Sequence, residues 1–184
     1  FYNTLMKCNQ PAVVIEPLNA YRLKEKMPKN LGEFCLPVGE IEIIKEGNDI
    51  TIVSYGSTLR IVSFVVDELE KIGINCELID VQTLIPFDQS KRIRESLSKT
   101  NRLLIVDEDL PGGASSYILQ ELLKKQDIYN LLDSPPELLT AKEHRPPYAE
   151  DGDYFTKPSK EDVFEKIISI MHEVDPNRYP SAES

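Results

Sequence analysis

Short apolar runs and amphipathic segments alternate along most of this chain. Runs of apolar, largely β-branched residues bounded by Gly, Pro, Asn or Asp predict buried strands. Between them, apolar residues recur every three or four positions, which predicts helices that bury one face. The predicted strands are residues 49–54, 74–81, 101–109 and 136–142, and the predicted helices are residues 58–71, 88–99, 115–125 and 159–173. The last helix has Ser159 as its N-cap.

This regular alternation predicts a compact α/β fold of three layers. Parallel strands joined by right-handed crossovers require helices on both faces of the sheet. Residues 39–56 differ, because two alternating segments flank a turn at Gly47 and Asn48. Such a pattern predicts a β-hairpin whose first strand lies at the edge of the sheet. We therefore expect a mostly parallel sheet with one antiparallel edge strand.

The flanking regions show no such alternation. Residues 11–17, PAVVIEP, predict one isolated strand that is closed by Pro17. Residues 19–37 mix charges with two Pro and a Gly, which is typical of a linker between domains, and residues 143–159 predict a loop. The N-terminus lacks an initiator Met and the pattern of a signal or transit peptide, so we expect a piece of a longer protein.

Charge and composition exclude several classes of protein. A net charge of −10 disfavours a nucleic-acid partner, because phosphate binding needs clustered Lys and Arg. The acidic surplus suits a basic protein partner, or it simply keeps the surface solvated. Apolar runs fall far short of the ~20 residues that span a bilayer. The three cysteines, Cys8, Cys35 and Cys76, are odd in number and far apart, which favours reduced thiols in the cytoplasm.

Two segments carry candidate chemistry at the ends of predicted strands. Residues 54–58, SYGST, link a strand to a helix and could cradle a phosphate or simply form a capped turn. Residues 107–113, DEDLPGG, place three carboxylates where open α/β sheets hold their ligands, although such acids are often only solvated or paired. A metal site would need further Asp, Glu or His residues nearby.

No catalytic constellation assembles from the residues alone. A nucleophile elbow is absent, because the sequence contains no Gly-x-Ser-x-Gly. His144 lies in a predicted loop without an obvious acid–base partner, and His172 lies near a helix end, where it would interact with the helix dipole. With only these two His, neither near a Cys pair, we expect no zinc site.

Four motifs in order carry a family resemblance. They are LPVGEIEIIKEGNDITIVSYGS (36–57), CELIDVQTLIPFD (76–88), SKTNRLLIVDED (98–109) and GGASSYI (112–118). Together they resemble the C-terminal domain of the beta subunit of thiamine-diphosphate-dependent 2-oxo acid dehydrogenases. The family signature Asp-x-x-Thr-Leu-x-Pro-aromatic-Asp is matched by Asp80, Thr83, Leu84, Pro86, Phe87 and Asp88. Pro86 would end the extended strand, and Asp88 would start the next helix.

The resemblance covers residues 11–172 and implies a domain organisation. Residues 1–30 would be the tail of a preceding pyrimidine-binding domain, residues 31–37 a linker, residues 38–174 a transketolase C-terminal-like domain, and residues 175–184 a polar tail. The sequence departs from the family in three places. Asp107 replaces the usual His or Gly, GGASSYI replaces a Gly-Gly-Phe-Gly-Ala-Glu run, and the segment RPPYAEDGDYFTKP is longer than expected.

For the whole enzyme, the resemblance implies oxidative decarboxylation of a 2-oxo acid, of the branched-chain 2-oxoisovalerate or pyruvate type. The acyl group passes to a lipoyl group on an acyltransferase partner. In the family, the residues that bind thiamine diphosphate and Mg²⁺ lie in earlier domains. We therefore assign no catalytic, cofactor-binding or metal-binding residue to this chain and expect it to be inactive alone.

The family role of this domain is assembly of a dimeric dehydrogenase and docking to the basic subunit-binding domain of the acyltransferase. The acidic surplus agrees with such docking. We assign the docking surface to Glu150, Asp151 and Asp153. Two alternatives remain: the same domain from a transketolase or a deoxyxylulose-phosphate synthase, and a free-standing flavodoxin-like binding module.

Overall fold

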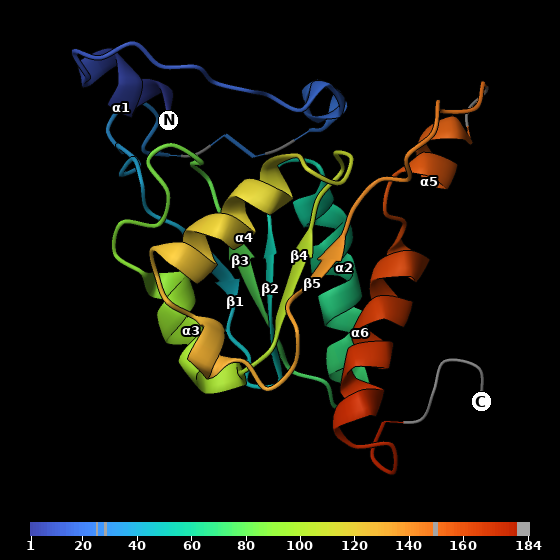
Figure 1. The fold of residues 1–184 in the computed structure, drawn as a ribbon. Coiled ribbons are helices and arrows are strands. Elements are labelled where there is room, and N and C mark those ends of the chain that lie inside the picture. Colours follow the sequence, from blue (N-terminus) through green and yellow to red (C-terminus); the bar gives the residue numbers. More distant parts are fainter. Residues whose placement is uncertain (25, 28, 149–150, 180–184) are drawn as a thin grey trace.

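A five-stranded sheet forms the centre of the molecule. The computed structural model describes residues 1–24, 26–27, 29–148 and 151–179. The strands run in the order β1-β3-β2-β4-β5 (Figure 1). They are β1 (Glu42–Lys45), β2 (Ile50–Ser54), β3 (Cys76–Asp80), β4 (Leu103–Val106) and β5 (Glu137–Leu139). All neighbours are parallel except β1, which is antiparallel to β3. The predicted mostly parallel sheet with one antiparallel edge strand is confirmed.

Helices cover both faces of the sheet, which gives the three predicted layers (Figure 1). One face carries α2 (Thr58–Lys71) and α6 (Lys160–Val174), and the other carries α3 (Arg92–Thr100) and α4 (Ala114–Lys124). Alternate residues of β2 face the two layers, so Ile52 packs toward α2 and α6 while Val53 packs toward α3 and α4. With both faces covered, β2 is buried along its whole length.

The predicted hairpin over residues 39–56 is wrong, although its first strand is an edge strand. β1 pairs with β3, where Ile43 lies opposite Ile79, while β2 lies between β3 and β4. Both sides of β2 are thus occupied, and β1 has no free edge there. Between β1 and β2 the chain passes close to β3, since a Cβ at Gly47 would lie 2.2 Å from the Cys76 carbonyl carbon. Gly47 therefore permits this close approach and does not form a hairpin tip.

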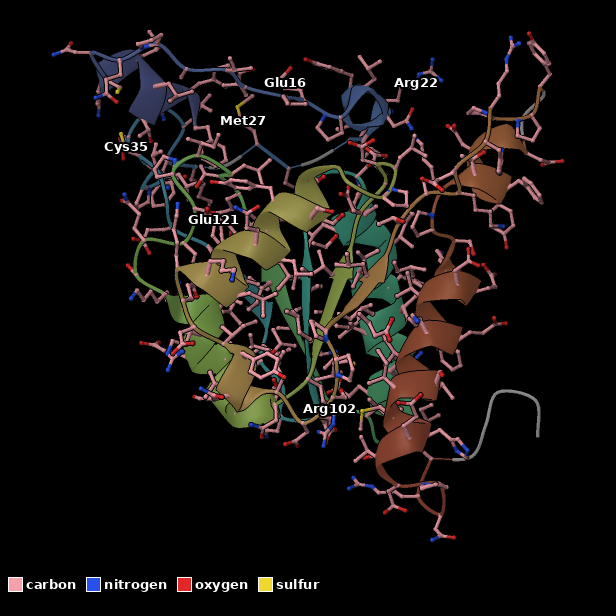
Figure 2. All side chains as sticks on the ribbon, viewed as in Figure 1. Glu16, Arg22, Met27, Cys35, Arg102 and Glu121 are labelled. Atoms are coloured by element: carbon pink, nitrogen blue, oxygen red, sulfur yellow. The ribbon has the colours of Figure 1, made fainter. Side chains whose placement is uncertain are left out.

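The predicted strand over residues 11–17 is also wrong. The N-terminal arm contains α1 (Tyr2–Lys7) and a 3-10 turn η1 (Leu18–Arg22), but residues 11–17 pair with no strand in the described part of the chain. Val13 is 90% exposed, and an apolar strand without a partner gains neither hydrogen bonds nor burial. Figure 2 shows Glu16, Arg22 and Met27 on this arm, outside the sheet and its helices.

The helices follow the sequence pattern with local differences. The capping box at Ser159 confirms the predicted N-cap of α6, because Ser159 Oγ accepts from Asp162 N and the Asp162 side chain accepts from Ser159 N. Phe64 of α2 is 48% exposed, since Val62, Val65, Val66 and Leu69 form the buried face of that helix. Besides α1 and η1, two further short elements were not predicted: η2 (Tyr129–Leu131) and α5 (Gly152–Thr156), which interrupts the expected loop. Across the described residues, the search for a helix with the length and hydropathy of a membrane span finds none.

Candidate functional site

The carboxyl ends of β2 and β4 meet at the centre of the sheet, where the chain reverses its direction across the sheet. From β2 the chain moves to β3 on one side, and it then crosses to β4 on the other side. In open α/β sheets, ligands bind in the crevice outside such a switch point. The two candidate segments, residues 54–58 and 107–113, follow these two strand ends. The structure therefore brings together two segments that the sequence indicated separately.

Asp107 lies at the centre of a hydrogen-bond network at the carboxyl ends of β2 and β4, which we call the strand-end network. Its carboxylate is fully buried and accepts three hydrogen bonds, from the Tyr55 hydroxyl at 2.6 Å, the Asp109 N–H at 3.0 Å and the Ser115 N–H at 2.9 Å. Burial, followed by the hydrogen bond to Asp107, raises the pKa of Tyr55 well above its ordinary value. Three donors satisfy the buried carboxylate and fix the start of α4, which is a structural role.

The SYGST turn is held by side-chain hydrogen bonds and has a carboxylate beside it, although Ser57, the N-cap residue of α2, makes no side-chain cap hydrogen bond. The hydroxyls of Ser54 and Thr58 are buried and lie 2.9 Å apart, and Thr58 Oγ1 donates to the Tyr55 carbonyl at 2.7 Å. Ser57 Oγ donates to Glu108 Oε2 at 2.7 Å, next to the first turn of α2. This carboxylate already supplies the negative charge that a helix N-terminus favours, and it would repel a phosphate. The geometry favours a structural turn over the phosphate cradle, but without the predicted side-chain cap.

Glu108 also connects the strand-end network to the segment before α6. Lys157 Nζ lies 3.2 Å from Glu108 Oε2 and 3.9 Å from an Asp153 carboxylate oxygen. The Thr156 carbonyl accepts from Lys142 N at 2.9 Å, and Thr156 Oγ1 donates to the Gly152 carbonyl at 2.7 Å. Residues Lys142 and Thr156 are thus joined to each other, and Lys157 is joined to Glu108 at the carboxyl end of the sheet.

The signature residues after β3 hold neighbouring elements together. Asp80 accepts from Gln82 N at 3.2 Å, and burial raises its pKa despite this bond. Thr83 Oγ1 accepts from Gly39 N at 2.9 Å, which secures the segment that leads into β1. The Phe87 ring packs edge-to-face on Tyr117 of α4, with centroids 6.4 Å apart. Leu84 is partly buried in the same apolar cluster, and Pro86 follows a cis peptide bond.

Asp88 binds the start of α3, although the helix begins four residues later than predicted, at Arg92. The two carboxylate oxygens accept from Arg92 N at 3.0 Å and from Ile93 N at 2.9 Å. Gln126 Nε2 adds a third bond at 2.9 Å from the segment after α4. Asp88 is 2% exposed, so these bonds are buried. The prediction that Asp88 starts the helix is wrong, because Lys91 is the N-cap residue of α3. The Asp88 carboxylate nevertheless binds the first two N–H groups of the helix.

The histidines make local contacts. His144 is exposed, its Nδ1 lies 2.9 Å from the Arg145 carbonyl, and its ring lies 5.4 Å from that of Phe155. His172 lies in the last turn of α6, and its Nδ1 lies 2.6 Å from the Tyr179 carbonyl. Both rings therefore contact backbone oxygens, and these contacts supply no acid–base pair.

The cysteines are free thiols: Cys8 is exposed, Cys35 is half-buried and Cys76 is buried. Burial raises the pKa of Cys76 to about 12, so this thiol stays protonated and unreactive at neutral pH. A sulfur in this state serves as a small apolar side chain of the core.

The carboxylates of the site do not suit a metal ion. In the part of the chain that the structure describes, no three His, Cys, Asp or Glu side chains are grouped so that they could hold one. Asp107 and Glu108 are bonded within the chain, and Asp109 Oδ1 accepts from Leu110 N at 2.8 Å. The described residues therefore do not fit the Mg²⁺ and diphosphate that the resemblance implies for the whole enzyme.

The predicted docking acids lie near α5. Asp151 is the N-cap residue of α5, and Asp153 lies in its first turn; both are exposed. Glu150 lies outside the described residues. The described acids are therefore available to a partner, apart from the long contact between Asp153 and Lys157.

Comparison with known proteins gives a consistent family. The family model described as "Transketolase, C-terminal domain" matches residues 39–163. The pyruvate dehydrogenase E1 component subunit beta of Mesostigma viride is 31% identical over 166 residues, which cover 90% of this chain and 50% of that protein. The mitochondrial 2-oxoisovalerate dehydrogenase subunit beta 2 of Arabidopsis thaliana is 32% identical over 164 residues, which cover 88% of this chain and 44% of that protein. The chain thus spans about half the length of the curated relatives it matches.

A solved structure shares the fold. A split-gene transketolase, described as an inactive beta4 tetramer, matches with a TM-score of 0.58 at 23% identity, over 72% of this chain and 41% of that chain. The family match begins at residue 39, just before β1, and ends at residue 163 in α6, so it includes the whole sheet. The chain therefore belongs to the transketolase C-terminal domain family.

Proposed function

We propose that this chain is the assembly and docking domain of the decarboxylating component of a 2-oxo acid dehydrogenase complex. One observation carries the proposal: beta subunits of pyruvate and 2-oxoisovalerate dehydrogenases match about nine-tenths of the chain, through the domain family to which it belongs. The whole enzyme would decarboxylate a 2-oxo acid oxidatively and pass the acyl group to a lipoyl group.

The chain would contribute structure to this reaction, while thiamine diphosphate and Mg²⁺ would be held by other parts of the enzyme. In support, the carboxylates at the switch point are bonded to Tyr55, Ser57 and backbone N–H groups. We expect the chain alone to release no CO₂ from a 2-oxo acid when thiamine diphosphate and Mg²⁺ are supplied. Turnover by the purified chain would refute this part of the proposal.

The finer proposal is a branched-chain substrate of the 2-oxoisovalerate type. The 2-oxoisovalerate and pyruvate relatives are 32% and 31% identical to the chain, so identity alone does not separate the two substrates. An enzyme reconstituted with its remaining parts should prefer 2-oxoisovalerate over pyruvate in kcat/KM. A preference for pyruvate would change the substrate and leave the docking role intact.

The docking partner we propose is the basic subunit-binding domain of the lipoyl acyltransferase. The net charge of −10 supports it, because charge complementarity speeds and orients association. Asp151 and Asp153 would face this domain from α5, and Glu150 would precede them.

Titration calorimetry of the chain with the partner's basic domain tests the docking role. We expect binding that weakens as salt rises from 0.05 to 0.5 M, by about 10-fold or more. Asp151→Asn with Asp153→Asn should weaken it further, whereas Glu95→Gln on the opposite layer should not. If the unaltered chain does not bind, the docking role is wrong. If the chain with Asp151→Asn and Asp153→Asn binds as tightly as the unaltered chain, the docking surface lies elsewhere.

A further inference from the structure

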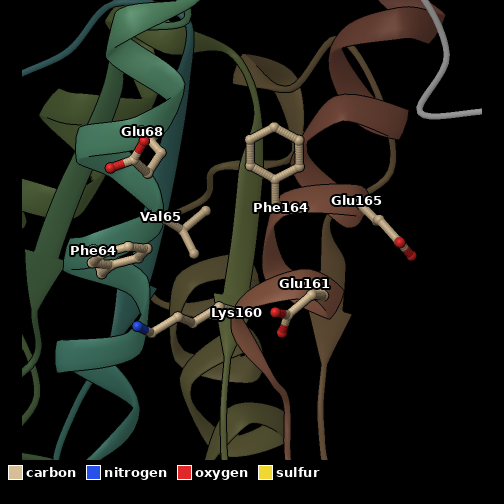
Figure 3. A pocket seen from close by; sticks show the side chains of 7 residues that line it. All are labelled: Phe64, Val65, Glu68, Lys160, Glu161, Phe164 and Glu165. Carbon is tan, nitrogen blue, oxygen red and sulfur yellow. The ribbon is translucent and has the colours of Figure 1, made fainter. Parts of the chain in front are cut away.

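A groove of about 240 Å³ lies between α2 and α6. Phe64 and Val65 of α2 and Phe164 of α6 form its apolar lining (Figure 3). Phe64 is 48% exposed, and the buried face of its helix is complete without it. An exposed aromatic ring beside a second one is the kind of surface that another protein chain buries.

Acidic side chains border this lining. Glu68 lies on α2, and Glu161 and Glu165 lie one turn apart on α6 (Figure 3). Lys160 is the one cation among the described residues that line the groove. Its ammonium lies over the Phe64 ring, 3.7 Å from the centroid, where the ring face carries partial negative charge. The groove therefore suits a segment that combines apolar side chains with positive charge.

An exposed segment of the same chain has this combination. It consists of η1 and the two residues that follow, residues 18–24 (LNAYRLK), and we call it the η1 segment. Side chains three residues apart align on a 3-10 helix, so Leu18 and Tyr21 share a face, where they are 82% and 69% exposed. Arg22 and Lys24 are also exposed, and the segment contains no acidic residue.

The η1 segment of a chain does not occupy that chain's own groove. Leu18 and Tyr21 are mostly exposed, and Figure 2 shows Arg22 on the arm, outside the sheet and its helices. A second copy of the chain carries the same segment, and its two cations complement the acidic border of the groove. A reciprocal exchange about a twofold axis would fill the grooves of both copies and close the pair.

We propose that two copies of this chain associate by placing the η1 segment of each in the groove of the other. Tyr21 packs against Phe64 and Phe164. Arg22 and Lys24 lie close to the carboxylates of the border. At an ionic strength of about 0.15 M the Debye length is about 8 Å, so the net charge of −10 on each copy is largely screened, while charges in contact still attract. This association is independent of the docking role, because it involves no other protein.

Sedimentation velocity of the full chain at about 0.15 M salt tests this association. We expect a monomer–dimer equilibrium that shifts toward the dimer as the concentration rises. Tyr21→Ala should weaken dimerisation about 10-fold, because it removes the apolar anchor. Tyr129→Ala is the matched control: Tyr129 is 74% exposed in the 3-10 turn η2, and its loss should change the dimerisation constant less than about 2-fold.

Reversed charges provide a second test. Arg22→Glu with Lys24→Glu makes the η1 segment acidic. Glu68→Lys with Glu165→Lys makes the border of the groove basic. Each double variant alone should dimerise at least about 10-fold more weakly, because like charges then meet. An equimolar mixture of the two should restore the dimer, since both contacts of the mixed pair again join opposite charges. Glu95→Lys, exposed on α3, is the charge control and should dimerise normally.

The outcomes decide the proposal. A chain that stays monomeric up to about 0.5 mM would overturn it. A dimer that neither Tyr21→Ala nor the double variants weaken would overturn it as well, because the contact would then lie elsewhere. A mixture of the double variants that stays monomeric would contradict the reciprocal exchange, and so would oligomers that grow beyond the dimer. Circular dichroism checks that each variant is folded, and should Tyr21→Ala unfold, the charge variants decide.

Discussion

The Tyr55 hydroxyl donates a 2.6 Å hydrogen bond to Asp107 Oδ1, and this bond joins the chain segments that leave β2 and β4. The crevice between these strands is the expected ligand site of an open α/β sheet. In this chain the polar groups at the crevice bind one another, so the crevice stabilises the fold.

Removal of this hydroxyl tests that conclusion. Tyr55→Phe keeps the ring but leaves a fully buried carboxylate with two donors in place of three. We expect the free energy of unfolding at pH 7 to fall by about 1.5–3 kcal/mol, as for a hydrogen bond to a charged group. Urea denaturation measures it, with Tyr129→Phe as the exposed control. Equal stability of the two variants would contradict a structural role for the bond.

Asp88 should be the most sensitive position of the family signature. Asp88→Ala removes the two hydrogen bonds that the carboxylate accepts from the first N–H groups of α3, and it leaves the Gln126 amide without its carboxylate partner. We expect a loss of about 2–4 kcal/mol, because a lost cap costs about 1 kcal/mol and an unpaired buried group adds to it. Circular dichroism during urea unfolding measures this loss. Glu95→Gln, exposed on the same helix, should stay within about 0.5 kcal/mol of the unaltered protein.

Glu77 should make stability depend on pH in the acid range. Burial would raise its pKa, but the Lys99 ammonium, the Ser96 side chain and the Gly47 N–H together hold the pKa of this carboxyl below its ordinary value of 4.5. A lowered folded pKa gives stability that is fully present above about pH 4.5 and is lost as the pH falls through the folded pKa. Glu77→Gln should therefore be less stable at pH 7 and should lose less stability on acidification.

Asp80 provides the opposite sign for comparison. Its pKa is raised by burial, so its ionisation opposes the folded state as the pH rises from about 3.8 through the folded pKa. Asp80→Asn should therefore give a steeper gain of stability with pH than the unaltered protein shows. Urea unfolding at several values between pH 3 and 7 compares both variants. Parallel pH profiles of the three proteins would contradict both assignments.

Local signals in the sequence predicted much of the fold. The Ser159 N-cap of α6 could be predicted, because Ser159 immediately precedes the amphipathic segment and Asp162 follows three residues later. The start of α3 at Arg92 could not, because Asp88 binds its first N–H groups from four and five residues earlier. The pairing of β1 with β3 could not be predicted. The turn signal at Gly47 is local, whereas the occupation of both edges of β2 by β3 and β4 depends on distant segments of the chain. Residues 11–17 have a strand composition, but strand formation also needs a neighbour.

The candidate site was predicted in position but not in detail. The acidic end of β4 and the turn after β2 could be located from the sequence, yet the bonds from Tyr55 to Asp107 and from Ser57 to Glu108 depend on the order of strands in the sheet. The groove between α2 and α6, which Phe64, Val65 and Phe164 line, was missed because helical periodicity describes each helix separately. Phe64 and Phe164 become one surface only when α2 packs against α6.

The strand order also bears on how fast this chain folds. Every ladder of the described sheet joins distant segments: Ile50 meets Cys76, Thr51 meets Leu103, and the antiparallel strand β1 reaches across to β3. Long loops must close before any of these ladders can form, which costs entropy early in the reaction. Such non-local topologies fold more slowly than helical bundles of similar stability, so we expect refolding over milliseconds to seconds.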